Sequence, residues 1–175
     1  MRNTNKIHKT AIIYPNVELG NNVYVGEYSV IGAPAEMRHA EQKSHGRVVI
    51  GSNTVIREHV TIHAPAEPDG VTYIDCHCYI MSHAHIGHDS ILGEFVTISS
   101  GAMVGGHSTL EPYVNMGLNS TTHQHTALGR GSMLAANGFA KGAVKAWQIV
   151  AGVPAKFLKH NNWLRKQLNL EEILK

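Results

Sequence analysis

The sequence predicts an all-β fold, a parallel β-helix in which three short strands make one turn. Three observations support it. An aliphatic residue recurs every six positions, a small residue follows it four positions later, and aromatic residues make up only 6% of a chain with 17 glycines. Neither an α-helix nor a simple strand has a period of six. If each repeat forms one face of a triangular prism, residues three repeats apart stack at the interstrand spacing of about 4.8 Å.

The repeats occupy three blocks of the chain, over residues 7–31, 50–62 and 74–134. The aliphatic position holds Ile7, Ile13, Leu19, Val25, Ile31, Ile50, Ile56, Ile62, Ile74, Ile80, Ile86, Leu92, Ile98, Val104, Leu110, Met116, Leu128 and Leu134. The pattern is interrupted once in the third block, at Thr122. One aliphatic residue per repeat fills the interior of a narrow prism, and the small residue fits its crowded corner.

We divide the chain into a β-helix over residues 1–145 and a C-terminal extension over residues 146–175. Two polar stretches with proline and glycine, residues 33–46 and 64–70, interrupt the repeat and are expected to leave the prism as loops. Loops of this kind often carry ligand contacts. The apolar spacing of the extension predicts a short helical tail that packs on the last coil and covers its open edge.

The composition restricts the partners. Charged residues make up 16% of the chain and the formal net charge is +2, so we expect neither nucleic acid nor an anionic membrane as a partner. Nowhere do about 18 apolar residues run together, which predicts a soluble, cytoplasmic protein without membrane insertion. Cys76 and Cys78 are too close in sequence to pair readily, and reduced thiols fit that location.

Histidines are concentrated in the third block of repeats, where seven of the 13 lie between Tyr73 and Thr126. A single histidine on such a surface is most often solvated or hydrogen-bonded, so their register is more informative than their number. Steps of three repeats give two neighbouring columns, with His88, Gly106 and Gln124 in one and Asp89, His107 and His125 in the other.

These columns fit acyl transfer. An imidazole is a suitable general base near neutral pH, and that of His88 can accept the proton of a hydroxyl or amine nucleophile. The backbone N–H of Gly106, with no side chain to shield it, can stabilise the oxyanion of a tetrahedral intermediate. Asp89 either orients the imidazole or is structural, because neighbours on a strand usually point to opposite faces. The catalytic residues predicted are therefore His88, Gly106 and Asp89.

Four short stretches resemble a known family. VIREHVTIH (55–63), MSHAHIGHD (81–89), MVGGH (103–107) and the His123-Gln124 pair are similar in order and context to the UDP-N-acetylglucosamine O-acyltransferases of lipid A biosynthesis. The resemblance implies a left-handed coil, which spacing alone does not determine, and a homotrimer with each active site between two subunits. It also implies that His88 is the general base and Gly106 the oxyanion donor. The substrate-binding residues expected are His85, His107, His123 and Gln124, with Asp89 beside them.

The prediction of the acyl donor depends on the positions at which this sequence differs from that family. Ala64 and Pro65 replace the Arg-Gly pair that follows TIH, and the family's long helical C-terminal domain has no counterpart in this sequence. The ending GVPAK (152–156) is similar to the small sugar and amino acid acetyltransferases of the same superfamily, which use acetyl-CoA. We therefore expect an acetyl-CoA or other acyl-CoA thioester, with acyl carrier protein as the alternative, and no tightly bound cofactor. The candidate contacts to the CoA phosphates are Lys141, Lys145 and Lys156.

The acceptor predicted is a hydroxyl or amine of a sugar or nucleotide sugar, but two other classes of protein compete. His63, His83 and His88 have the order and approximate spacing of the zinc ligands of γ-class carbonic anhydrases. That family's arginine-aspartate pair and its Asn-Ile-Gln-Asp element are absent, so the sequence favours a site without metal. A purely structural β-helix is the third possibility. It would give no reason for Asp89 and His107 to stack beside His88.

Overall fold

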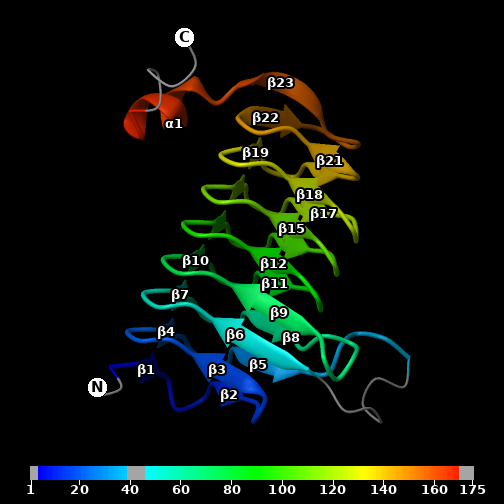
Figure 1. Ribbon diagram of the computed structural model, residues 1–175. Coiled ribbons are helices and arrows are strands. Elements are labelled where there is room, and N and C mark those ends of the chain that lie inside the picture. Colours follow the sequence, from blue (N-terminus) through cyan, green and yellow to red (C-terminus); the bar gives the residue numbers. More distant parts are fainter. Residues whose placement is uncertain (1–3, 39–45, 170–175) are drawn as a thin grey trace.

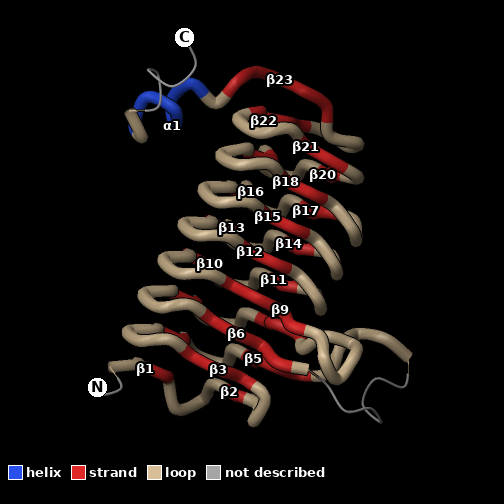
Figure 2. Tube along the Cα trace, viewed as in Figure 1, coloured by secondary structure: helices blue, strands red, loops and turns tan. Residues whose placement is uncertain are grey.

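Short strands wind into a triangular prism, as the six-residue period predicts (Figure 1). The computed structural model describes residues 4–38 and 46–169. Each full turn of the coil contributes one strand to each of three sheets, and tight turns at the corners join the strands (Figure 2). The prediction of a parallel β-helix is confirmed.

The described part of the chain forms one sheet of nine strands and two of seven. Sheet A contains β1 (Lys6–Ile7), β4 (Tyr24–Val25), β7 (Val55–Ile56), β10 (Tyr79–Ile80), β13 (Thr97–Ile98), β16 (Asn115–Met116), β19 (Met133–Leu134), β22 (Gln148–Ala151) and β23 (Lys156–His160). Sheet B contains β2 (Ile12–Ile13), β5 (Val30–Ala33), β8 (Thr61–His63), β11 (His85–Ile86), β14 (Met103–Val104), β17 (Thr121–Thr122) and β20 (Phe139–Ala140). Sheet C contains β3 (Val17–Leu19), β6 (Arg47–Ile50), β9 (Val71–Ile74), β12 (Ile91–Leu92), β15 (Thr109–Leu110), β18 (Ala127–Leu128) and β21 (Ala143–Val144).

The strand register follows the predicted step of three repeats wherever the repeats are uninterrupted. Ile80 pairs with Ile98 in sheet A, Ile86 pairs with Val104 in sheet B, and Leu92 pairs with Leu110 in sheet C. The two insertions lengthen this step, so that Ile31 pairs with Ile62 and Ile56 pairs with Ile80. Columns obtained by counting residues are therefore reliable only between coils that no insertion separates.

The interior of the prism is a stack of aliphatic side chains, and Ile56, Ile86 and Leu110 are fully buried. At the corners lie small buried residues, one of which bridges successive coils: the Ser90 hydroxyl donates a hydrogen bond to the Gly105 carbonyl at 3.3 Å. Thr122 occupies the interior position where the aliphatic pattern is interrupted. Its hydroxyl accepts a hydrogen bond from the Gly105 N–H at 3.0 Å, which satisfies a polar group inside the coil.

Many of the histidines lie at corners where the backbone has a positive φ. His59, His77, His83, His107 and His125 all have φ between 57° and 60°. Histidine, asparagine and aspartate tolerate this left-handed conformation better than bulky or β-branched residues. Their rings stack between coils, with centroids 4.8 Å apart for His59 and His83. The turn geometry therefore accounts for part of the histidine clustering.

The parallel ladder continues past the expected boundary at residue 145, because β22 pairs with β19. The strand β23 then runs antiparallel beside β22, an element that the sequence did not predict. The helix α1 (Asn162–Gln167) follows, and Asn161 anchors its start by donating a hydrogen bond to the Gly131 carbonyl at 2.9 Å. No helix in residues 4–38 and 46–169 has the length and apolar character needed to cross a membrane.

The two insertions lie side by side next to β5 and β8 (Figure 1). The Ala64 N–H donates to the Ala33 carbonyl at 2.8 Å, and the Gly46 N–H donates to the Glu67 carbonyl at 3.1 Å. Residues 64–66 are buried rather than extended into solvent. Residues 39–45 of the first expected loop lie outside the described residues. The described parts of the two insertions are therefore joined by hydrogen bonds next to sheet B.

Candidate active site

A pocket of about 400 Å³ lies over sheet B, beside the joint insertions. Five of the residues predicted from the sequence line it: His85, His88, Gly106, His123 and Gln124. They come from three successive coils, because the strands β11, β14 and β17 pair in register. The predicted column of an imidazole above a glycine and an amide is thus brought together in one pocket.

His88 and Asp89 form a hydrogen-bonded pair at the edge of this pocket. The Nδ1–H of His88 donates to Asp89 Oδ2 at 2.7 Å, and both side chains are largely buried. The two neighbours reach each other because Asp89 has a φ of 58° at a corner, not the alternating geometry of a strand. With Nδ1 as the donor, Nε2 of a neutral His88 carries the lone pair that a general base requires.

Further hydrogen bonds hold Asp89 in place. Its backbone N–H donates to the Thr72 hydroxyl at 2.8 Å, and its Oδ2 accepts from the Ala66 N–H at 3.2 Å. The second contact comes from the insertion at residues 64–70, which therefore supports the carboxylate. His107 lies beside the pair, with its Nε2 3.8 Å from Asp89 Oδ2 and its ring at right angles to that of His88. His107 does not line the pocket.

Gly106 allows the coils to approach closely at the reactive nitrogen. A Cβ atom at this position would lie 2.8 Å from His88 Nε2. The Gly106 carbonyl accepts a hydrogen bond from the His125 N–H at 2.9 Å, whereas its own N–H makes no hydrogen bond to a described residue. A backbone N–H without a hydrogen-bond partner, in the residue that packs against the His88 ring, is a candidate oxyanion donor.

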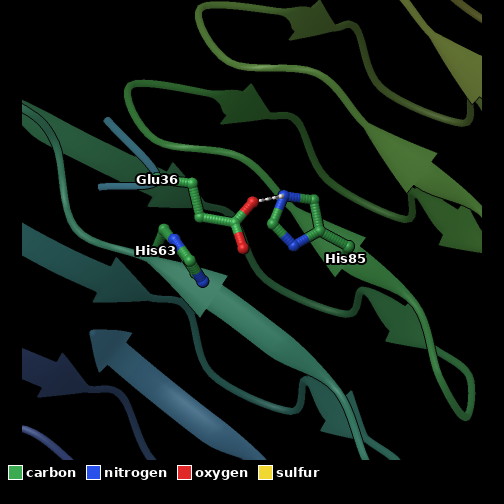
Figure 3. A group of neighbouring side chains, drawn as sticks. All are labelled: Glu36, His63 and His85. Atoms are coloured by element: carbon green, nitrogen blue, oxygen red, sulfur yellow. Dashed lines mark ion pairs between the residues drawn. The ribbon is translucent and has the colours of Figure 1, made fainter. Parts of the chain in front are cut away.

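Two further titratable side chains line the pocket next to His85. Glu36 and His63, which the sequence did not place there, line the pocket together with His85. Nδ1 of His85 lies 2.9 Å from the Thr61 hydroxyl, and its Nε2 lies 3.9 Å from Glu36 Oε2 (Figure 3). Burial lowers the pKa of both His63 and His85, and Glu36 partly opposes this shift. Both imidazoles therefore favour the neutral form.

Other lining residues missed by the sequence analysis could have been found by the same arithmetic. Steps of three repeats from His85 lead to Met103, Thr121 and Phe139, and the sheet pairs these residues in that order. All three line the pocket. Glu36 and His63 gave no such signal, because the insertions change the step between coils.

The single chain does not bring the predicted CoA contacts into the pocket, and it does not bring the three predicted zinc ligands together. Lys141, Lys145 and Lys156 are exposed on the last coil and β23, and none lines the pocket. His83 stacks on His59 at a corner and does not line the pocket, in contrast to His63 and His88. Among the described residues, the two groups whose ligand atoms lie close enough to share an ion are Glu36, His63 and His85, and His88, Asp89 and His107.

Comparison with known proteins agrees with the repeat. The family model for bacterial transferase hexapeptide repeats matches residues 1–33 and 72–117. The solved UDP-N-acetylglucosamine acyltransferase of Francisella novicida superimposes with a TM-score of 0.77 at 26% identity, covering 95% of this chain and 70% of that one. The Arabidopsis enzyme superimposes with a TM-score of 0.84 at 22% identity, covering 95% of this chain and 65% of that one. The chain belongs to the hexapeptide-repeat superfamily of left-handed β-helix proteins.

Within that superfamily, the chain is similar to one family of enzymes. It is 31% identical over 130 residues to the acyl-[acyl-carrier-protein]–UDP-N-acetylglucosamine O-acyltransferase of Campylobacter concisus, covering 74% of this chain and 50% of that protein. The enzyme of the same name from Burkholderia lata is 33% identical over 118 residues, covering 66% and 44%. The chain thus spans about half the length of these relatives. The resemblance inferred from the sequence motifs is confirmed.

Proposed function

We propose that this protein is an acyltransferase that moves an acyl group from a thioester to a nucleotide sugar. The observation that carries the proposal is the His88–Asp89 pair, whose free ring nitrogen faces Gly106 in the pocket. The similarity to UDP-N-acetylglucosamine O-acyltransferases, together with the resemblance of the motifs around these residues to that family, supports the same chemistry.

The proposed reaction assigns one task to each group. Nε2 of His88 accepts the proton of the acceptor hydroxyl or amine as its oxygen or nitrogen bonds to the thioester carbonyl carbon. Gly106 N–H stabilises the resulting oxyanion. The carbon–sulfur bond then breaks, and the thiolate receives the proton from His88. Asp89 keeps the imidazole in the correct tautomer and stabilises its protonated form.

The acyl donor proposed is acyl carrier protein, in preference to the CoA thioester that the sequence suggested. The relatives from Campylobacter concisus and Burkholderia lata both carry acyl carrier protein in their names. Lys141, Lys145 and Lys156 are exposed and remain candidates for contact with the phosphate groups of either donor. The acceptor proposed is UDP-N-acetylglucosamine or a related nucleotide sugar, in contact with His85, His123 and Gln124.

Thioester consumption tests this proposal directly. Acyl carrier proteins and CoA carrying chains of different length are offered with and without UDP-N-acetylglucosamine, and the acylated sugar is identified by mass spectrometry. We expect acceptor-dependent release of free thiol that is faster with acyl carrier protein than with CoA. Faster release from CoA would refute the donor assignment. Thiol release that is independent of every nucleotide sugar would contradict the acceptor assignment.

A further inference from the structure

The corner at Asp89 is built differently from the corner that stacks on it. On the next coil, the N–H of the corner residue His107 donates a hydrogen bond to the backbone carbonyl of His88 at 2.9 Å. Among the described residues, no backbone carbonyl accepts the N–H of Asp89. This N–H donates instead to the side-chain hydroxyl of Thr72 at 2.8 Å. The exception concerns the residue whose carboxylate holds the proposed general base.

The second insertion explains why a carbonyl is missing below Asp89. Strands β9 and β12 pair in the step of three repeats, so the carbonyl expected to face the Asp89 N–H is that of Gly70. Gly70 ends the insertion, and its carbonyl accepts a hydrogen bond from the Arg47 N–H at 3.1 Å. The chain therefore enters β9 from the insertion rather than from a corner turn. Thr72, the second residue of β9, supplies the acceptor in its place.

Side-chain acceptors of this kind are otherwise confined to the start of the coil. The N–H groups of Asn22 and Tyr28 donate to the hydroxyls of Thr4 and Thr10 on the first coil. At the other described corners where a residue other than glycine has a positive φ, the N–H donates to a backbone carbonyl. Beyond the first coil, Asp89 is thus the one described corner residue of this kind whose N–H depends on a side chain.

The Thr72 hydroxyl acts at the backbone from which the Asp89 side chain extends. Thr72 is fully buried, and Asp89 has a φ of 58°. A left-handed φ in a residue other than glycine persists only where the surroundings hold it, and a buried N–H needs an acceptor. The carboxylate has little freedom of its own, because a Cβ atom at Gly70 would lie 3.0 Å from Asp89 Oδ1. A change in the backbone at Asp89 would therefore move the carboxylate away from His88.

We propose that Thr72 is a positioning residue for acyl transfer. Its hydroxyl replaces the corner carbonyl and holds Asp89 where the carboxylate orients the imidazole of His88. This inference rests on the proposed function, in which His88 is the general base. Thr72 does not line the pocket, so its effect is on the rate of proton transfer and not on the binding of the acceptor.

Steady-state kinetics of two variants test this role. Thr72→Val removes the hydroxyl and keeps the shape of the side chain. We expect kcat to fall by about 10- to 100-fold, because a small displacement of a catalytic group is enough for a loss of that size. The KM for the acceptor should not change. Thr72→Ser retains the hydroxyl, and we expect it to restore kcat to within a few-fold of the unmodified protein.

Thr54 provides a matched control for the loss of a buried hydroxyl. Like Thr72, it is fully buried and lies two residues before an interior isoleucine. Its hydroxyl also accepts a backbone hydrogen bond, from the Cys78 N–H at 3.3 Å, but it lies outside the pocket and away from the His88–Asp89 pair. Thr54→Val should lower the melting temperature about as much as Thr72→Val, because each loses a buried hydrogen bond. Its kcat should not change.

Crystal structures of the variants provide a measurement that needs no turnover. His88 Nδ1 and Asp89 Oδ2 are 2.7 Å apart in the unmodified protein. We expect this contact to lengthen beyond hydrogen-bond distance in Thr72→Val and to be retained in Thr72→Ser and Thr54→Val. If Thr72→Val does not fold, Thr72→Ala takes its place in both measurements, because it removes the hydroxyl without adding a methyl group.

Several results would overturn this proposal. A kcat within a few-fold of the parent in Thr72→Val would do so, and so would a loss confined to the KM for the acceptor. An equal fall of kcat in Thr54→Val would show a general effect of lost stability. An unchanged contact between His88 and Asp89 in Thr72→Val would also contradict the positioning role. If the unmodified protein transfers no acyl group, the proposed function fails, and the crystal structures alone decide whether Thr72 holds the pair.

Discussion

The histidines of this protein occupy different positions within the six-residue repeat, counted from the interior aliphatic residue. The position determines whether the side chain lies at a corner or in the pocket. Corner histidines such as His77 and His83 follow the interior aliphatic residue by three positions and have a positive φ. His88 follows it by two positions, and His85 precedes it by one. His85 and His88 line the pocket, as do His63 and His123, which follow the interior position by one, whereas His77 and His83 do not. Position within the repeat therefore separates the turn residues from the pocket residues.

The two thiols provide a test of burial at the residue scale. Burial raises the pKa of Cys78 to about 12, whereas Cys76 is only partly buried. A raised pKa in the folded state stabilises the fold below the unfolded pKa, and this contribution is lost as the pH rises toward 12. At pH 8 we expect Cys78 in a Cys76→Ser variant to resist alkylation until the protein is unfolded, as measured by mass spectrometry. Rapid alkylation of the native variant would contradict this burial.

At the scale of the strand, uninterrupted repeats determine the register and therefore the site. The column of His88, Gly106 and Gln124 could be predicted because no insertion lies between those coils. Glu36 could not be predicted as a neighbour of His85, because the insertions change the step between coils and the shape of a loop is not periodic. The antiparallel strand β23 was not predicted either, because it lies beyond the repeats and its sequence is not periodic. The roles assigned to the catalytic residues remain predictions.

The close approach of two coils at Gly106 leads to a prediction for this element. In Gly106→Ala, the new Cβ would lie 2.8 Å from His88 Nε2, so the imidazole must move. The backbone N–H is retained and φ lies outside the left-handed region, so we expect the variant to fold. Displacement of the general base should lower kcat/KM by about 100-fold or more. Full activity with an unchanged melting temperature would show that the position of His88 does not matter.

At the scale of the whole molecule, we predict that the chain assembles into a homotrimer. The resemblance to hexapeptide-repeat acyltransferases implies this state, and Ile91, Met103 and Leu118 are about half exposed in the single chain. Light scattering at micromolar concentration should give three times the 19.1 kDa of the chain. A monomer would contradict the expectation that each pocket is completed by a neighbouring subunit.

The central claim is that one imidazole, held by Asp89, performs the proton transfer of acyl transfer. His88→Ala removes the proton acceptor without changing the aliphatic interior, and His83→Ala removes a stacked corner histidine outside the pocket. Turnover of acyl carrier protein thioester with UDP-N-acetylglucosamine should fall by about 10²- to 10⁴-fold in His88→Ala. It should stay within a few-fold of the unmodified protein in His83→Ala, and both variants should unfold at the same temperature as the parent. Undiminished turnover in His88→Ala, or an equal loss in the two variants, would contradict the assignment.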